Sequence, residues 1–369
     1  MELDLACGRG IGLSLILFSM TAILASQTER AKTPTAEPKL SEEVFKNIQI
    51  LKGTPSDQLI PAMQFISSSL GVECSFCHVE GALEKDDKKP KQTARKMMQM
   101  MAAINQANFD GKTKVTCYSC HRGSTRPANI PLIAEQETPP TSVPVVPQVD
   151  QILARYVEAA GGTSAIEKLT TRVAKGHVTL AGKQFPIEVF SKTPGKQMSV
   201  IHLPIGDSVT AYDGVSGWTL TPNRPLHYIS TAEATSARLE ADLQLPIHLK
   251  QLFTEIKAEK TEKVGEREVY VVSAFNAGEL AAKFYFDEQS GLLVRMVRYV
   301  NSLLGLNPTQ IDYADYREQD GVKMPFRQTI SRFRSRLAIQ MDEANTNVPL
   351  NDAKFVPPSD LPVDRSISQ

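Results

Sequence analysis

The sequence lacks a surplus of charge of either sign. Lys and Arg number 41, as do Asp and Glu, so the formal net charge is +0. A domain that binds nucleic acid carries a basic footprint, so we expect no nucleic acid partner. Hydrophobic residues make up 41% of the chain, which is ordinary for a globular protein with a real core. The length of 369 residues is typical of about two domains.

Long apolar runs are also scarce. The run from Ile11 to Ala25 is shorter than the ~20 residues that a transmembrane helix needs. Arg9 precedes it and small residues lie at its end, which predicts a secretory signal peptide over residues 1–26 and a periplasmic location. The residues before Gln27 are not a clean A-x-A cleavage site. The alternative that the N-terminus is not cleaved and associates with the membrane is therefore left open.

Cysteine is rare, and its placement is informative. Of five cysteines, Cys7 precedes the apolar run. The other four form two short motifs, Cys74-Ser75-Phe76-Cys77-His78 and Cys117-Tyr118-Ser119-Cys120-His121. C-x-x-C-H is the attachment signature of c-type haem, and chance predicts only about 0.001 copies in a chain of this composition. The thiols of each motif form thioethers with the porphyrin, and the histidine ligates the iron from below. The sequence thus predicts two covalent haem c groups, with iron ligands His78 and His121.

Other uses of two C-x-x-C pairs fit less well. Zinc sites of this type place the pairs ~15–20 residues apart, whereas 39 residues separate Cys77 from Cys117. Zinc also does not need a histidine after both pairs. A thioredoxin-like motif needs a βαβ context, and this segment is predicted to be helical. Two disulfides would be ordinary in an exported protein, but they would not explain the histidines.

The sixth iron ligand has few candidates. Residues 41–126 contain no histidine besides the two in the motifs, so methionine is the expected distal ligand. Met63 stands alone on a short predicted helix, Pro61 to Leu70, before the first motif, and we assign it to the first haem. The second motif follows a predicted helix, Lys91 to Ala107. Four methionines lie on that helix, and periodicity does not choose among them: Met97, Met98, Met100 and Met101.

Residues from about Asn47 to Pro127 resemble the cytochrome c subunit of photosynthetic reaction centres. The resemblance rests on five stretches, which are Met63-Gln64-Phe65-Ile66, Gly71-Val72-Glu73-Cys74-Ser75-Phe76-Cys77-His78, Ala94-Arg95-Lys96-Met97, Ile104-Asn105 and Val115-Thr116-Cys117-Tyr118-Ser119-Cys120-His121-Arg122-Gly123. In that family each haem unit is a helix that bears the methionine, a turn and a C-x-x-C-H helix. The resemblance implies that Met63 and Met97 are the distal ligands.

The chain departs from that family in two respects. The familiar subunit has four haems, whereas this chain has two motifs and resembles one dihaem half. Family members carry a histidine in the loop before the second motif, which reaches another haem. The corresponding loop, Gln106 to Thr116, contains none. A respiratory or other periplasmic electron carrier fits as well as a photosynthetic one.

The remainder of the chain has a different character. Prolines mark residues 127–149 as a linker, after a tether at 27–40 and a cytochrome domain at 41–126. Residues 150–357 begin with a predicted helix, Val149 to Ala160, followed by short strands between turn signals and a helical stretch, and 358–369 form a tail. The strands are expected at these places: Val178 to Ala181, Ile187 to Phe190, Val209 to Tyr212, Val269 to Ala274, Phe284 to Phe286, Leu292 to Val300 and Gln328 to Ile339; the helical stretch is Thr231 to Phe253.

Three patterns in residues 150–357 resemble periplasmic proteins of the outer-membrane lipoprotein-sorting type. They are Asp213-Gly214-x-x-Gly217-Trp218, Phe286-Asp287-x-x-x-Gly291-Leu292-Leu293, and Tyr313-x-Asp315-Tyr316-x-x-x-Asp320-Gly321-x-x-x-Pro325-Phe326. The resemblance implies an antiparallel β half-barrel over helices, with an apolar concavity that could hold an acyl chain. The expected fold is thus α+β, with a small helical dihaem domain followed by this half-barrel.

The sequence predicts an electron-transfer protein rather than an enzyme. Its partners would be redox donor and acceptor proteins, among them a membrane-bound electron-transfer complex. The alternative hypothesis is a periplasmic lipid- or lipoprotein-binding protein that uses residues 150–357, with the haems in a sensing or structural role.

Overall fold

The computed structural model describes residues 39–128, 146–332 and 335–359. The predicted signal peptide, most of the tether and linker and almost all of the tail therefore lie outside the described residues. The helices of the N-terminal part are α1 (Ser41–Val44), α2 (Leu59–Leu70), α3 (Cys74–Cys77), α4 (Lys89–Asn108) and α5 (Cys117–His121), with the 3-10 turn η1 (Ser56–Gln58) before α2. None of the helices in the described residues combines the length and apolar character that crossing a bilayer requires.

The two helices predicted before the motifs are confirmed. Helix α2 ends where Gly71 adopts a left-handed conformation, with φ of 68°, as expected of a glycine that ends a helix. Helix α4 has a proline in its first turn, where its missing N–H costs nothing. Its three most buried side chains are Lys91, Met98 and Asn105. They recur every seven residues, so they form one stripe along the helix.

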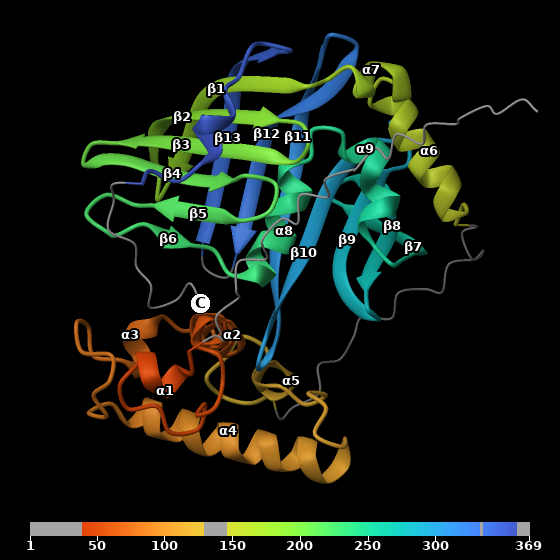
Figure 1. Cartoon of the computed structure of the whole chain (residues 1–369). Coiled ribbons are helices and arrows are strands. Elements are labelled where there is room, and N and C mark those ends of the chain that lie inside the picture. Colours follow the sequence, from red (N-terminus) through yellow and green to blue (C-terminus); the bar gives the residue numbers. More distant parts are fainter. Residues whose placement is uncertain (1–38, 129–145, 333–334, 360–369) are drawn as a thin grey trace, which may run out of the picture. The chain divides into compact units, whose positions relative to one another are not determined.

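The C-terminal part is an antiparallel sheet packed on helices. Thirteen strands pair in the order β6-β5-β4-β3-β2-β1-β13-β12-β11-β10-β9-β8-β7. Figure 1 shows α6, α8 and α9 against this sheet. The strands are β1 (Thr171–Leu180), β2 (Lys183–Lys192), β3 (Lys196–Leu203), β4 (Gly206–Tyr212), β5 (Gly217–Leu220), β6 (His227–Tyr228), β7 (Glu255–Val264), β8 (Arg267–Asn276), β9 (Glu279–Asp287), β10 (Leu293–Ser302), β11 (Gly305–Gln319), β12 (Val322–Arg332) and β13 (Ser335–Thr346). The helices are α6 (Val149–Ala159), α7 (Thr163–Glu167), α8 (Thr231–Ala241) and α9 (Leu245–His248), with the 3-10 turns η2 (Leu249–Leu252) and η3 (Asp352–Phe355).

The predicted fold class is confirmed, but two of the predicted secondary-structure elements are wrong. The expected strand from Gln328 to Ile339 is two strands, β12 and β13, which pair with each other. The expected helical stretch from Thr231 to Phe253 is three shorter elements, α8, α9 and η2. Pro246 sits in the first turn of α9, where proline starts a new helix rather than continuing an old one.

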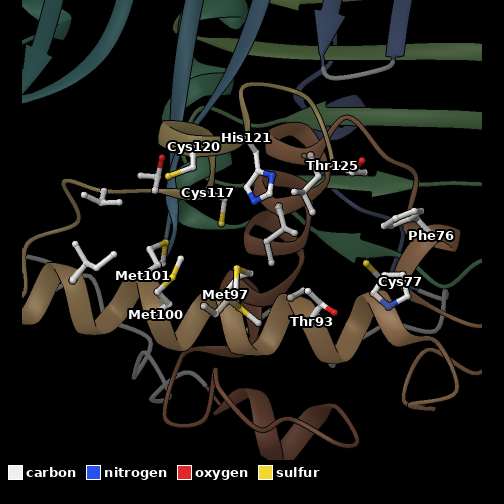
Figure 2. Close-up of a pocket in the computed structure, with 18 of the residues that line it drawn as sticks. Phe76, Cys77, Thr93, Met97, Met100, Met101, Cys117, Cys120, His121 and Thr125 are labelled. Atoms are coloured by element: carbon white, nitrogen blue, oxygen red, sulfur yellow. The ribbon is translucent and has the colours of Figure 1, made fainter. Parts of the chain in front are cut away.

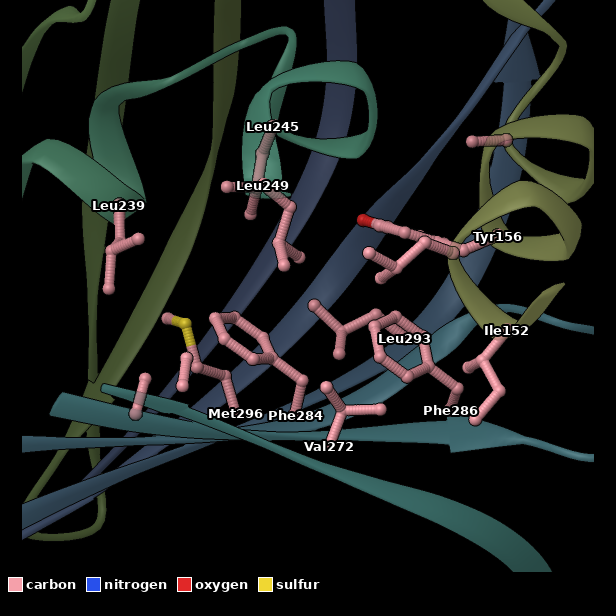
Figure 3. Close-up of a cluster of buried hydrophobic side chains, with 14 of the residues drawn as sticks. Ile152, Tyr156, Leu239, Leu245, Leu249, Val272, Phe284, Phe286, Leu293 and Met296 are labelled. Carbon is pink, nitrogen blue, oxygen red and sulfur yellow. The ribbon is translucent and has the colours of Figure 1, made fainter. Parts of the chain in front are cut away.

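The helices fill the apolar face of the sheet. Leu239, Leu245 and Leu249 meet Phe284 and Met296 in one cluster, in which no member is more than 9% exposed. Figure 3 shows these side chains between the helices and β8–β10. The concavity implied by the second resemblance is therefore occupied by the protein's own core.

The β10–β11 hairpin contacts the N-terminal helices. Ser302 pairs with Gly305, so Leu303 and Leu304 form the turn. Leu304 is 4% exposed and packs in a cluster with Phe65 and other residues of α2. Asn307 Nδ2 donates a hydrogen bond to the Pro61 carbonyl oxygen at 3.0 Å. This contact fixes the helix that carries Met63.

Candidate functional site

The first motif forms a single helical turn. Helix α3 contains both thiols, and the His78 amide donates to the Cys74 carbonyl oxygen at 3.0 Å. Residues three apart lie on the same face of a helix, so the geometry places Cys74 and Cys77 side by side with His78 directly after them. This is the arrangement that attachment to one edge of a porphyrin requires.

The second motif repeats this arrangement in α5. Thr116 caps the helix reciprocally with Ser119: the Thr116 amide donates to Ser119 Oγ at 3.0 Å, and the Ser119 amide donates to the Thr116 carbonyl oxygen at 3.1 Å. Cys117 and Cys120 again lie three residues apart, and His121 ends the helix. None of the four thiols of the two motifs is in a disulfide.

Both histidines have one ring nitrogen fixed by a backbone carbonyl. His78 Nδ1 lies 2.8 Å from the Leu83 oxygen, and His121 Nδ1 lies 3.0 Å from the Ser124 oxygen. A carbonyl oxygen only accepts, so Nδ1 is the donor in each contact, and Nε2 is the ring nitrogen left to bind a metal. Metal-ligating histidines are held in this way, with the second nitrogen donating to a carbonyl or carboxylate.

The first motif opens onto a cavity of about 540 Å³, a size usual for cofactor sites. Cys74, Cys77 and His78 line it together with Met63. The structure thus brings all four residues predicted for the first haem to one pocket. Its remaining walls come largely from the segment before α2 and from α2 itself, including Phe45, Ile48, Ile50 and Leu51.

The second motif opens onto a cavity of about 330 Å³. Cys117, Cys120 and His121 line it, and so do all four candidate methionines of α4: Met97, Met98, Met100 and Met101. Figure 2 shows Met97 on the side of α4 that faces His121, with Met100 and Met101 further along the helix. Met98 is only 8% exposed and belongs to the buried cluster with α2, whereas Met97 is 39% exposed. The choice of Met97 stays a prediction.

The apolar side chains around the motifs are unusually exposed. Phe76, Leu83, Met100 and Tyr118 are between 43% and 57% exposed. Phe76 and Met100 line the second cavity and Leu83 lines the first, so a flat apolar group such as a porphyrin in each cavity would cover exposed apolar surface. The residues present therefore fit two haem c groups.

The two pockets share part of their walls. Ile66, Cys77, Ala94 and Met98 line both cavities. Helix α2, which precedes the first motif, also holds the segment after the second motif, because the Gly123 amide donates to the Ser69 carbonyl oxygen at 2.9 Å. Groups bound in the two cavities would therefore be neighbours.

Burial affects one thiol of each motif. Desolvation by burial is the largest effect at both sulfurs, and it raises the pKa of Cys77 and of Cys117. Burial disfavours the charged form of a thiol. These two sulfurs therefore stay protonated at neutral pH until they react.

Two residues of α4 that motif reasoning gave no role hold the loops beside the motifs. Asn105 Nδ2 donates to the Val115 carbonyl oxygen at 2.7 Å, and Asn105 Oδ1 accepts from the amides of Lys114 and Val115 at 3.1 and 2.9 Å. Lys91 Nζ donates to the Leu83 carbonyl oxygen at 2.9 Å. The sequence did contain a signal for the role of Lys91. A lysine in the first turn of a helix opposes the helix dipole, and this one follows a loop with acidic residues.

The N-terminal part of the chain is similar to known cytochrome subunits. Residues 6–164 match the family model of the photosynthetic reaction centre cytochrome C subunit. The photosynthetic reaction center cytochrome c subunit of Roseobacter denitrificans is 32% identical over an alignment of 139 residues, and the match covers 33% of this chain and 37% of the relative. That of Thermochromatium tepidum is 33% identical over an alignment of 133 residues, and the match covers 32% of this chain and 31% of the relative. The predicted resemblance is confirmed, and the chain spans about a third of the length of these relatives.

Solved structures align with somewhat more than half of the chain. A domain described as an outer membrane lipoprotein-sorting protein from Vibrio parahaemolyticus aligns with a TM-score of 0.41 and 12% identity, over 56% of this chain and 96% of that one. A LolA superfamily protein from Nitrosomonas europaea aligns with a TM-score of 0.40 and 13% identity, over 57% and 98%.

Proposed function

We propose that this chain is an exported dihaem c-type cytochrome that carries single electrons and is not an enzyme. The observation that carries the proposal is the state of the two histidines. Each follows a pair of thiols on one helical turn, has its Nδ1 proton held by a carbonyl, and lies in an apolar cavity that contains a methionine on another helix. Bound haem supplies the one-electron redox couple of iron.

The residues have separate roles in this proposal. Cys74 and Cys77 attach the first haem, and Cys117 and Cys120 attach the second. His78 and Met63 ligate the first iron, and His121 and Met97 ligate the second. The wall that both cavities share, which includes Met98, keeps the two groups adjacent. An electron entering one site can therefore leave by the other, between a donor and an acceptor protein such as a membrane-bound electron-transfer complex.

The test is to express the full chain in a bacterium that matures c-type cytochromes and to measure its intact mass. We expect covalent mass for two haems, and a reduced-minus-oxidised spectrum of a low-spin c-type protein. Replacing Cys74 and Cys77 together by Ser removes one haem, and the same change at Cys117 and Cys120 removes the other. Polypeptide without covalent haem would refute the proposal.

The same preparation tests location and the lipid-binding alternative. A periplasmic fraction that contains the haem protein would support export, with or without cleavage near residue 26. For the alternative, an acyl chain would have to displace Leu239, Leu245 and Leu249 from the sheet. We therefore expect no acyl chain in the native mass spectrum, and a stoichiometric one would support lipid binding by residues 150–357.

A further inference from the structure

His78 and Lys91 bind the same carbonyl oxygen. Leu83 O accepts from His78 Nδ1 at 2.8 Å and from Lys91 Nζ at 2.9 Å. The Lys91 ammonium is nearly buried and also donates to the next two carbonyls of the loop, Glu84 O at 2.9 Å and Lys85 O at 2.8 Å. One ammonium thus holds the loop that orients the histidine.

A carboxylate lies between this ammonium and a second cation. Asp86 Oδ1 lies 3.1 Å from Lys91 Nζ, and Asp86 Oδ2 lies 2.8 Å from Arg95 Nη1. One carboxylate therefore faces two cations, and the Asn47 side-chain amide, which donates to Asp86 at 2.9 Å, adds no charge. Lys88 Nζ binds the Ser75 carbonyl oxygen on the other side of the motif. Glu73, Glu84 and Lys46 also line the first cavity, so Lys91 acts through its own place at the Leu83 oxygen and not through a net positive site.

The second site is built without such a cation. His121 Nδ1 donates to the Ser124 carbonyl oxygen at 3.0 Å. In the described ranges, no ammonium or guanidinium group donates to that oxygen. The second histidine therefore donates to an ordinary carbonyl, and the first to one that an ammonium has already polarised.

We propose that Lys91 is a positioning residue for His78 and holds the first site at a higher reduction potential than it would otherwise have. A hydrogen bond from a ligating histidine raises the basicity of the ligand. A carbonyl that already accepts from an ammonium is a poorer acceptor, so His78 is a weaker donor to the metal. The positive charge of the Lys91 ammonium acts in the same direction, because the reduced centre carries one positive charge fewer.

The inference rests on the proposed function and needs the protein with both haems. The experiment is a potentiometric titration of Lys91→Met, with Lys88→Met as the matched control, because it removes an equal charge beside the same motif without touching Leu83 O. We expect Lys91→Met to lower one of the two potentials by about 59 mV, which is a tenfold change in the reduction constant for one electron. Lys88→Met should produce a smaller shift, and Lys91→Arg should retain most of the potential.

The shifted step is assigned by repeating the titration in a chain with Cys117→Ser and Cys120→Ser, which keeps only the first attachment site. If Lys91→Met loses that haem, Lys91→Gln takes its place, since it keeps a donor and removes the charge. Equal shifts from Lys88→Met and Lys91→Met would overturn the shared-carbonyl argument, as would unchanged potentials at full haem content. Wild-type protein without covalent haem would instead refute the proposed function.

Discussion

Asn105 should be the residue of α4 on which the second motif depends most. Its side chain is 5% exposed and makes three hydrogen bonds, one to the Val115 carbonyl and two from the amides of Lys114 and Val115. Asn105→Ala removes all three. The loss of each hydrogen bond would cost ~1–3 kcal/mol of stability if its backbone partner were left buried without another partner. Lys114 is exposed and Val115 half-buried, so water replaces part of the loss, and we expect a total of about 3 kcal/mol.

The control is Asn108→Ala on the same helix. Asn108 is exposed and makes one side-chain hydrogen bond, from Nδ2 to the Ile104 carbonyl oxygen at 3.0 Å. Its loss should cost less than about 0.5 kcal/mol, as is usual for surface substitutions. Urea unfolding followed at the haem absorbance, which reports on the cytochrome part alone, gives the difference. Equal midpoints for the two variants would refute the view that this loop is held by one amide.

Three further changes test the site. Met97→Ala should leave the haem attached but open its iron to carbon monoxide, which absorbance detects, while Met100→Ala should not; the reverse result would move the distal ligand to Met100. Gly71→Ala should destabilise the chain in urea more than Gly53→Ala, because both glycines have positive φ but only at Gly71 would a Cβ strike a backbone carbonyl; equal losses would contradict that clash. Hydrogen bonds from Arg95, Asn47 and Lys91 lower the pKa of Asp86. The stability that Asp86 contributes is therefore present above its unfolded pKa and is lost as pH falls towards the folded value. The stability of an Asp86→Asn variant should depend less steeply on acid pH, and an unchanged pH dependence would exclude this role.

The sequence predicts the elements whose ends carry residues that start or stop a helix or strand. Helix α2 could be predicted because Pro61 lies in its first turn and Gly71 ends it. The division between β12 and β13 could not be predicted, because residues between Arg332 and Ser335 include no Gly, Pro, Asn or Asp, the residues that signal turns. A run of strand-forming residues without such a signal looks like one long strand.

The residues of the candidate site likewise fall into those that the sequence predicts and those that it does not. The two C-x-x-C-H motifs are local, so the attachment residues follow from spacing alone. The residues that orient the motifs are not local: the buried stripe of α4 consists of Lys91, Met98 and Asn105, and two of its three members are polar. Hydrophobic periodicity cannot find such a stripe, and only the structure shows that its polar members bind the loops on either side of the shared wall.

The β10–β11 turn extends this reasoning to the C-terminal part. Leu303 and Leu304 are apolar at a hairpin tip, where polar turn residues are the rule, and Gly305 follows with φ of 147°. A Cβ at Gly305 would approach the Phe65 ring to 2.5 Å, so glycine is needed for the close contact with α2. Phe65 lies on the same helix as Met63, two residues away. The sheet therefore does more than follow the cytochrome part in sequence: its hairpin completes the core beneath the helix that supplies the expected distal ligand of the first haem.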